Sequence, residues 1–249
     1  MKILLYLSLA VASIYSTVGN CAQFQGSTTP AFGTAERKLL YNQDATKRLR
    51  QAIYNYDVKA AEKALLEKAD PTYDDNGRLY LIFLGTLLQS YASDNPQSQG
   101  ETVAKTRKLM QLLLDNNADA NAKSFNGNTI LHAAVLNRDL PLVKFSLKAG
   151  TNINAKNNKQ ETPLMQAVQQ MSHPKIIDLL LSSGADTAQA DDTETTVLDQ
   201  LILNTQDYIN NRTHSPHIKA ILDIFIRYFS QKNDKTTVNT LKEIARELN

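Results

Sequence analysis

The residues of this chain best suited to chemistry are His132 and a pair of histidines, His214 and His217, close to Asp207. A histidine can serve as a general base, but no Ser or Cys nucleophile has a recognisable setting around His132. Two histidines can ligate zinc, yet a zinc site takes three or four ligands at known spacing, and Pro216 interrupts the pair. We therefore predict neither catalytic residues nor a metal site.

Other sequence patterns that carry chemistry are also missing. The sequence contains neither a phosphate-binding glycine-rich loop nor a zinc-protease helix, so we predict no cofactor. Cys21 is the only cysteine, which excludes an internal disulfide and a cysteine metal cluster. The net charge is only +2, whereas a nucleic-acid-binding protein carries a clustered basic face. We therefore expect no nucleic-acid partner.

The first 22 residues have the layout of a secretory signal peptide. Lys2 gives a short positive start, residues 3–18 are mostly apolar, and small residues that suit a signal peptidase follow. Polar residues within the apolar run weaken it as a permanent membrane span. We predict a signal peptide over 1–22, a flexible linker over 23–44, and export to the periplasm or out of the cell, with an uncleaved anchor as the alternative.

Cys21 raises a lipoprotein as a further alternative, because it lies at the end of the apolar run. Asn20 stands where a lipoprotein signal has a small residue, which argues against lipidation. Residues 211–213 form an N-glycosylation acceptor, which matters only in a eukaryotic secretory pathway. An exported protein without a disulfide pair fits a bacterial envelope better.

The elements that must position any site are clearest in residues 128–184, where one helical pattern is repeated. Thr129 and Thr162 lie 33 residues apart, and each hydroxyl can cap the first turn of a helix. Gly150 and Gly184 then suit the left-handed residue that ends a second helix. Apolar residues recur at helical spacing after each Thr, namely Leu131, Ala134 and Val135, then Leu164, Ala167 and Val168. The pattern predicts two helix-turn-helix units.

These units resemble the ankyrin-repeat family. The first copy reads Thr-Ile-Leu-His-Ala-Ala from Thr129, and the second reads Thr-Pro-Leu-Met-Gln-Ala from Thr162. A T-P-L-H-x-A run with a period near 33 residues marks the ankyrin repeat. The resemblance implies a stack of helix pairs that binds proteins without catalysis. It also implies that His132 holds neighbouring repeats together by hydrogen bonds.

Less regular repeats flank the two clear ones. The helical period begins at Ala45, and the first unit closes at Lys68, where the later units have Gly or Asn. In the later units, the Thr at the start of the first helix lies ten residues after an Asp or Asn of the preceding loop. The same count from Asp70 predicts a first helix over 79–89. Its buried positions would then be Ile82, Gly85 and Thr86.

Two polar insertions, over 93–100 and 204–216, interrupt the second and the last unit. A final helix with an apolar stripe would cover the last repeat, with Val238, Leu241, Ile244, Ala245 and Leu248 on that stripe. We predict an all-α ankyrin-repeat solenoid of about five repeats over 45–235, followed by a capping helix over 236–249.

The resemblance also implies where a partner binds, since ankyrin repeats use the concave side formed by loop tips and first helices. The tip positions are Phe125, Asn126, Asn128, Asn158, Lys159, Glu161, Asp192, Thr193 and Thr195, and the helix positions are Leu136, Asn137, Gln169 and Gln170. Phe125 is an aromatic residue at a tip. The fold does not require an aromatic residue there unless its ring packs on the neighbouring tip. The polar, mixed charge of this surface favours a protein partner.

Two classes of function follow. The first is a monomeric, non-enzymatic protein-binding module of the envelope or the exterior, or a translocated bacterial effector that acts on a host protein. The second is an enzyme with its site in the 204–217 insertion, which would require His214, His217 and Asp207 to converge. The sequence does not identify the partner, because a fold does not name a function.

Overall fold

A computed structural model describes residues 41–72, 79–92, 100–211 and 217–248 of the chain. Within these ranges the structure consists of eleven helices and contains no strand. The predicted signal peptide and most of the predicted linker, residues 1–40, lie outside the described residues. A compact unit begins at Tyr41 and includes all of the helices.

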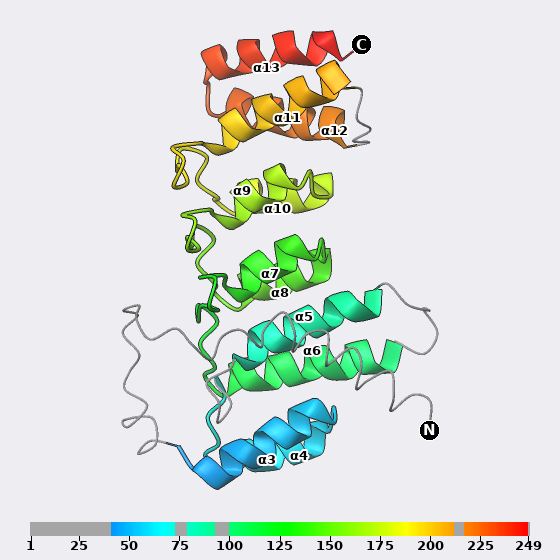
Figure 1. Ribbon diagram of the computed structural model, residues 1–249, viewed down its shortest axis with the longest axis vertical. Helices are drawn as coiled ribbons and strands as arrows, with labels where there is room; N and C mark the ends of the chain where they lie inside the picture. The colour runs from blue at the N-terminus through cyan, green and yellow to red at the C-terminus, as the bar shows by residue number, and fades with distance from the viewer. Residues whose placement is uncertain (1–40, 73–78, 93–99, 212–216, 249) are drawn as a thin grey trace. The chain divides into compact units, whose positions relative to one another are not determined.

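Short turns connect α3 with α4, α7 with α8 and α9 with α10, whereas longer loops join α6 to α7, α8 to α9 and α10 to α11 (Figure 1). In chain order they are α3 (Gln43–Tyr54), α4 (Val58–Leu66), α5 (Tyr80–Ala92), α6 (Gly100–Asp115), α7 (Ile130–Leu136), α8 (Leu140–Lys148), α9 (Pro163–Gln169), α10 (Pro174–Ser182), α11 (Val197–Asn211), α12 (Ile218–Gln231) and α13 (Lys235–Glu247).

The helix pairs stack in two layers. The first helices of successive pairs contact one another, α5 with α7, α7 with α9 and α9 with α11. The second helices form the other layer through the contacts of α8 with α10 and of α10 with α12. Five pairs from α3 to α12 therefore build a solenoid in the described part of the chain, and the last helix, α13, packs on α11 and α12. The predicted all-α solenoid is confirmed.

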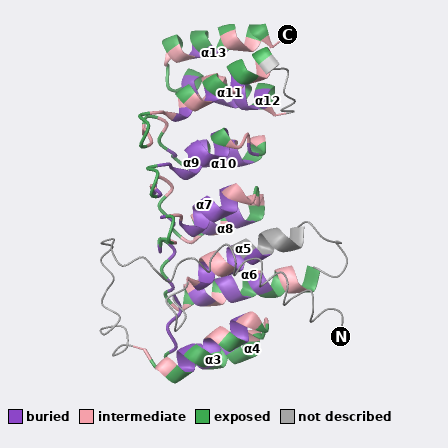
Figure 2. Ribbon diagram, viewed as in Figure 1, coloured by how far each residue is buried: buried purple, intermediate pink, exposed green. Residues whose placement is uncertain are grey.

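A continuous apolar core runs between the two layers (Figure 2). Ala134 and Ala167 are fully buried, and small residues at these positions allow neighbouring helices to approach closely. The predicted apolar residues of both clear repeats are buried as well, Leu131 and Leu164 among them. Because each pair cannot bury its apolar face alone, the stack supplies most of the stability.

Left-handed backbone conformations recur with the repeat even where the sequence does not. The second residue after the end of α4, α6, α8 and α10 has a positive φ, with values of 64° at Lys68, 64° at Asn117, 76° at Gly150 and 93° at Gly184. The turns between the helices of a pair show the same conformation at Tyr56, Arg138 and Met171. The irregular first repeat therefore keeps the backbone of the regular ones, and Lys68 carries the strain that Gly avoids.

The predicted register of the second repeat is wrong by one residue. Leu81 and Leu84 are buried, whereas Ile82 is only half-buried. The predicted Gly85 is buried, and the side chain of Thr86 lies outside the described residues. The amide of Asn137 donates to Gly85 O, as the amide of Asn204 does to Val168 O one repeat later. These equivalent bonds align Leu79 with Thr129, so nine residues separate Asp70 from the start of this helix instead of ten.

The predicted insertion over 204–216 is wrong in its first half, because α11 continues to Asn211. Thr205 is fully buried, and its hydroxyl donates to Leu201 O one turn earlier at 2.7 Å. Tyr208 and Ile209 are half-buried, so they extend the same stripe by one turn. Most of the other predicted insertion lies outside the described residues, since α5 ends at Ala92 and α6 begins at Gly100.

The final helix closes the stack as predicted. Val238 and Leu241 are buried, while Ile244, Ala245 and Leu248 pack partly buried against the core. The outer face of α13 is exposed (Figure 2). Among the described helices, none is long and apolar enough to cross a bilayer.

Candidate partner-binding surface

The loop tips of successive repeats are tied into a ladder by backbone hydrogen bonds. Asn158 N donates to Asn126 O at 3.0 Å, and Asp192 N donates to Lys159 O at 3.1 Å. Lys123 Nζ also donates to Lys156 O at 2.8 Å. Because each tip is bonded to the next, the tips form a ridge with a fixed spacing from which side chains can present to a partner.

Phe125 lies on this ridge and is 72% exposed. Its carbonyl accepts a hydrogen bond from the side chain of Asn158 at 2.8 Å, so the neighbouring tip holds the backbone of Phe125 and leaves its ring exposed. An exposed aromatic ring on a rigid backbone costs little entropy to bind, which makes it a suitable anchor for a partner.

Two other predicted tip residues are less accessible, since Glu161 is buried and Asn128 is half-buried. Glu161 is only 9% exposed, and Asn157 Nδ2 donates to Glu161 Oε2 at 2.8 Å. The same Asn157 amide donates to Asn128 Oδ1 at 3.2 Å. Asn128 and Glu161 therefore help to shape the tips, whereas Asn158 and Lys159 are exposed.

The predicted helix positions differ in what they can offer. Gln169 is exposed, while Leu136, Asn137 and Gln170 are half-buried. The Asn137 amide is used in its bond to Gly85 O at 3.0 Å. Of these four residues, Gln169 presents the most side chain for contact with a partner.

Leu203 on α11 is a surface residue that the sequence interpretation missed, and it is 59% exposed. It lies 34 residues after Gln169 and 67 after Leu136, so it occupies the same position of its repeat. The repeat spacing from Leu136 and Gln169 points to Leu203, but the predicted loop over 204–216 drew attention away from the end of this helix.

On the first repeats, Tyr54 and Phe83 form a tilted ring pair with centroids 5.0 Å apart.

A shallow hollow lies between α9, α11 and the tip that joins α10 to α11. Its volume is about 10 Å³. The residues that line it are Glu161, Met165, Gln169, Asp191, Thr195, Thr196 and Gln200. It brings together three predicted site residues, Glu161, Gln169 and Thr195.

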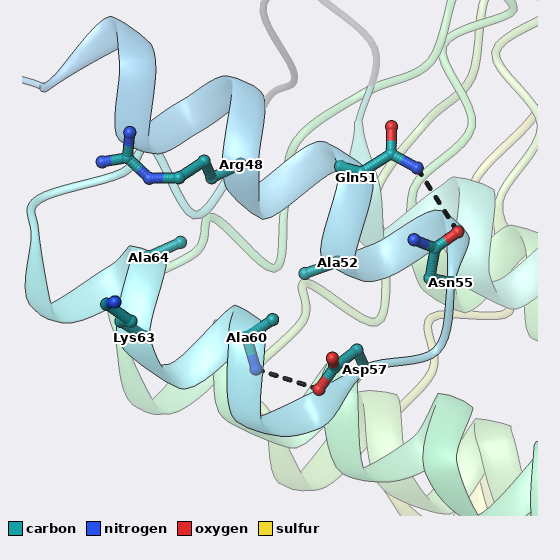
Figure 3. A pocket seen from close by; sticks show the side chains of 8 residues that line it. All are labelled: Arg48, Gln51, Ala52, Asn55, Asp57, Ala60, Lys63 and Ala64. Carbon is teal, nitrogen blue, oxygen red and sulfur yellow. Dashed lines mark hydrogen bonds between the residues drawn. The ribbon is translucent and has the colours of Figure 1, made fainter.

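A larger hollow of about 240 Å³ lies between α3 and α4, with the other helices behind it (Figure 3). Arg48, Lys63 and Asp57 lie at it, and Ala52 and Ala64 are buried beneath. The Gln51 side chain donates to Asn55 Oδ1 at 3.3 Å. The charged and amide side chains around this hollow suit the open end of a stack, where a terminal repeat needs a polar outer face.

His132 is fully buried and joins two repeats. Thr129 N donates to His132 Nδ1 at 3.2 Å, and His132 Nε2 lies 3.2 Å from Glu161 O. Because a carbonyl only accepts, the ring proton must be on Nε2. Burial lowers the pKa of His132, which outweighs the hydrogen bond to Glu161 O. The neutral ring is thus a structural link, as the resemblance implied.

The other candidate chemical group is not assembled in the described residues. His217 contacts His173 with ring centroids 5.4 Å apart, Asp207 is exposed on α11, and His214 lies outside the described residues. Within the described ranges, no group of three or more His, Cys, Asp or Glu side chains could hold a metal ion.

The family model described as "Ankyrin repeats (3 copies)" matches residues 102–191. This stretch carries ankyrin repeats. It runs from α6 to the tip before α11, and the helix pairs on either side continue the same stack. The described chain is therefore an ankyrin-repeat solenoid.

Known relatives are similar over parts of the chain only. FPV031, a putative ankyrin repeat protein of Fowlpox virus (strain NVSL), is 40% identical over 90 residues, which are 36% of this chain and 26% of FPV031. The E3 ubiquitin-protein ligase KEG of Arabidopsis thaliana is 37% identical over 87 residues, 34% of this chain and 5% of KEG. The phosphocholine transferase AnkX of Legionella pneumophila is 29% identical over 124 residues, 45% of this chain and 13% of AnkX. The chain thus spans about a quarter or less of these relatives.

Proposed function

We propose that this chain is a non-enzymatic protein-binding module, exported to the cell envelope or out of the cell, that holds a protein partner on its concave ankyrin surface. The observation that carries the proposal is the exposure of Phe125 at 72% and Leu203 at 59%. Both lie at positions that ankyrin repeats use for partners. Burial of such apolar side chains in an interface is favourable, so their place on this face, and not their exposure alone, suits them to anchor a partner.

Capture of partners from a lysate of the source organism, and of any host, tests this surface. Phe125→Ala and Leu203→Ala should each weaken capture of the same partner, because each removes an apolar anchor. Leu66→Ala is the matched control, since Leu66 is 85% exposed on α4, a helix of the other layer. A partner that binds both surface variants as strongly as the unaltered chain would place the binding site elsewhere.

Export is proposed from the layout of residues 1–22. The intact mass of the protein isolated from its source should lack this segment, and the protein should be found in the periplasmic or the extracellular fraction. Recovery of the full-length chain in the cytoplasm would overturn export through a signal peptide.

A second candidate is a bacterial effector that acts on a host protein. The observation behind this candidate is the similarity of part of the chain to AnkX, a phosphocholine transferase of the bacterium Legionella pneumophila. Under this candidate, residues 1–22 would stay on the mature protein, and Phe125→Ala would weaken capture from host lysate but not from the bacterial envelope.

A further inference from the structure

Among the helices in the middle of the stack, only those of the second layer contain Asp, Glu, Lys or Arg. The first helices α5, α7 and α9 have none, whereas α6, α8 and α10 together have six basic and three acidic residues. Three ion pairs use part of this charge, and they are Glu101–Lys105, Asp178–Arg227 and Arg107–Asp139. The charges that remain on α6, α8 and α10 are four lysines and one aspartate, so the surface of these helices is basic.

The four remaining lysines are exposed, and they are Lys108, Lys144, Lys148 and Lys175. Among the described residues, none of their ammonium groups takes part in an ion pair. The remaining acid, Asp115, accepts a hydrogen bond from the Gln111 side chain at 2.7 Å. An acidic partner would therefore be attracted to the four lysines without having to break an existing ion pair.

An apolar row crosses the same three helices. It consists of Leu112, Phe145 and Leu179, each of which lies five residues before the left-handed residue that follows its helix. The three residues therefore occupy one position of three successive repeats. All three are half-buried and pack against the core, so each leaves part of its side chain available for contact.

The lysines flank this row along each helix. Lys108 and Lys175 lie four residues before Leu112 and Leu179, and Lys148 lies three residues after Phe145. Residues three or four apart are neighbours on the surface of a helix, and Lys144 lies four residues before Lys148 in the same way. We call the four lysines and the three residues of the apolar row the lysine face.

The three helices lie side by side. α8 contacts α10, and Arg107 of α6 pairs at 3.5 Å with Asp139, the residue that caps the start of α8. Packed helices lie about 8–10 Å apart, and seven residues of an α-helix rise about 10.5 Å. A partner helix that lies across α6, α8 and α10 can thus place every seventh residue against one member of the apolar row. Acidic residues three and four positions later would then lie beside the lysines.

A membrane surface fits the lysine face less well than a helix does. Helices that bind a bilayer bury an apolar face about 5–10 Å deep in the lipid. Leu112, Phe145 and Leu179 are instead half-buried against the core of the protein. They offer an apolar surface on which another side chain can lie, and they lack the exposed area that insertion into lipid requires.

We propose that the lysine face binds an acidic amphipathic helix of a partner protein. The apolar row contacts the apolar side of that helix, and the four lysines attract its carboxylates. The face belongs to the second helices, whereas Gln169 and Leu203 belong to the first helices. It is therefore a second binding surface, separate from the concave surface of the proposed function.

A peptide of this chemistry tests the proposal without the natural partner. The probe is three copies of Leu-Ala-Ala-Glu-Glu-Ala-Ala in one chain, acetylated and amidated, and it is added to the ¹⁵N-labelled protein while amide signals are followed by NMR. We expect saturable shifts at Lys108, Phe145 and Leu179, with a dissociation constant on the order of 0.1 mM. A peptide of the same composition in scrambled order should bind at least about fivefold more weakly, because its leucines do not match the apolar row.

Variants with equal charge changes separate the lysine face from the net charge of the chain. Lys144→Glu should weaken peptide binding about tenfold, because it removes an attraction and adds a repulsion. Lys242→Glu is the matched control, since Lys242 is an exposed lysine of α13, away from the face. It should change binding less than about twofold. Phe145→Ala removes the central apolar contact and should weaken binding about tenfold, while Lys144→Glu alters an exposed residue and keeps the test valid if Phe145→Ala unfolds.

Equal binding of the ordered and the scrambled peptide would overturn the proposal, as would an equal loss in Lys144→Glu and Lys242→Glu. Vesicles of equal parts phosphatidylglycerol and phosphatidylcholine provide the comparison with a membrane. If they bind the chain and lose it in Lys144→Glu while the peptide does not bind, the face is a lipid surface and the proposal is wrong. Phe125→Ala should leave peptide binding unchanged. A partner captured through Phe125 and Leu203, without any peptide binding, would leave the proposed function standing and reject the lysine face alone.

Discussion

At the scale of single residues, His132 shows how one side chain joins two repeats. Its Nδ1 accepts from Thr129 N within its own repeat, while Nε2 donates to Glu161 O in the next one. The ring must be neutral for both bonds to form, because a protonated Nδ1 could not accept. Stability should therefore depend on the protonation of this buried group.

The pH dependence has a definite sign. Burial lowers the pKa of His132 below its ordinary value of 6.5 in the folded chain. The unfolded chain then takes up the proton first as pH falls, so this part of the stability is complete above about pH 6.5 and is lost below it. Urea unfolding between about pH 7.5 and pH 5.5 should show the decline, and His132→Gln should be less stable but should show a shallower decline. An unchanged slope in the variant would mean that other groups cause it.

Gly127 is required at its tip for two reasons. Its φ of 76° is unfavourable for other residues, and an added Cβ would lie 2.5 Å from Asn158 Oδ1. We expect Gly127→Ala to destabilise the chain by about 1–3 kcal/mol, measured by urea unfolding. Gly100→Ala is the control, because its Cβ would meet no atom within 4 Å. Equal effects of the two substitutions would contradict this account.

The residue level also shows where sequence interpretation stops. Helix spacing and caps predict the core positions such as Leu131 and Leu164, and both are buried. The positions that ankyrin repeats use for partners correctly predict an exposed Phe125. The same positions predict that Glu161 is exposed, and this prediction is wrong. Glu161 is internal because the Asn157 and Gln166 amides bond to it, and such local hydrogen bonds leave no periodic mark in a sequence.

At the scale of elements, the ends of the second helices show how strongly the backbone of the repeat is imposed. Lys68 adopts a φ of 64°, although a left-handed conformation costs an L-residue with a Cβ about 1–2 kcal/mol. Lys68→Gly should relieve this strain and, after the larger entropy of Gly in the unfolded chain is subtracted, stabilise by about 0.5–1 kcal/mol in urea unfolding.

The reverse substitution provides the matched test. Gly150 has a φ of 76°, and its added Cβ would meet nothing within 4 Å. Gly150→Lys should therefore destabilise through the backbone alone, by about 1 kcal/mol. Stabilisation by Gly150→Lys, or destabilisation by Lys68→Gly, would show that side-chain contacts and not φ decide these positions.

The errors of element prediction have a common cause. A ten-residue count gave the wrong register for α5, because the loop before it is one residue shorter than the loops of the later repeats. The polar residues after Leu203 predict a loop, but Thr205 bonds within the helix and is buried. Loop length and helix extension are set by contacts with neighbouring repeats, so a local pattern predicts them poorly.

At the scale of the whole molecule, the contacts of the stack are nearly all between neighbours. Each helix pair packs on the pair before it and the pair after it, and α13 packs on the last pair alone. The stability of such a solenoid is close to a sum of repeat and interface terms. Loss of packing at one end should therefore remain near that end, whereas loss in the middle should spread in both directions.

Two substitutions of the same kind test this linear coupling. Leu241 on α13 and Leu164 on α9 are both 1% exposed, and Leu→Ala at such sites typically costs about 2–5 kcal/mol. Hydrogen exchange followed by mass spectrometry should show faster exchange in α11 to α13 for Leu241→Ala, with α7 and α8 unchanged. Leu164→Ala should speed exchange from α7 to α12, since α9 contacts α7, α10 and α11. A uniform rise over all helices in both variants would instead mean that the repeats unfold as one cooperative unit, because the interfaces would then outweigh the stability of each repeat.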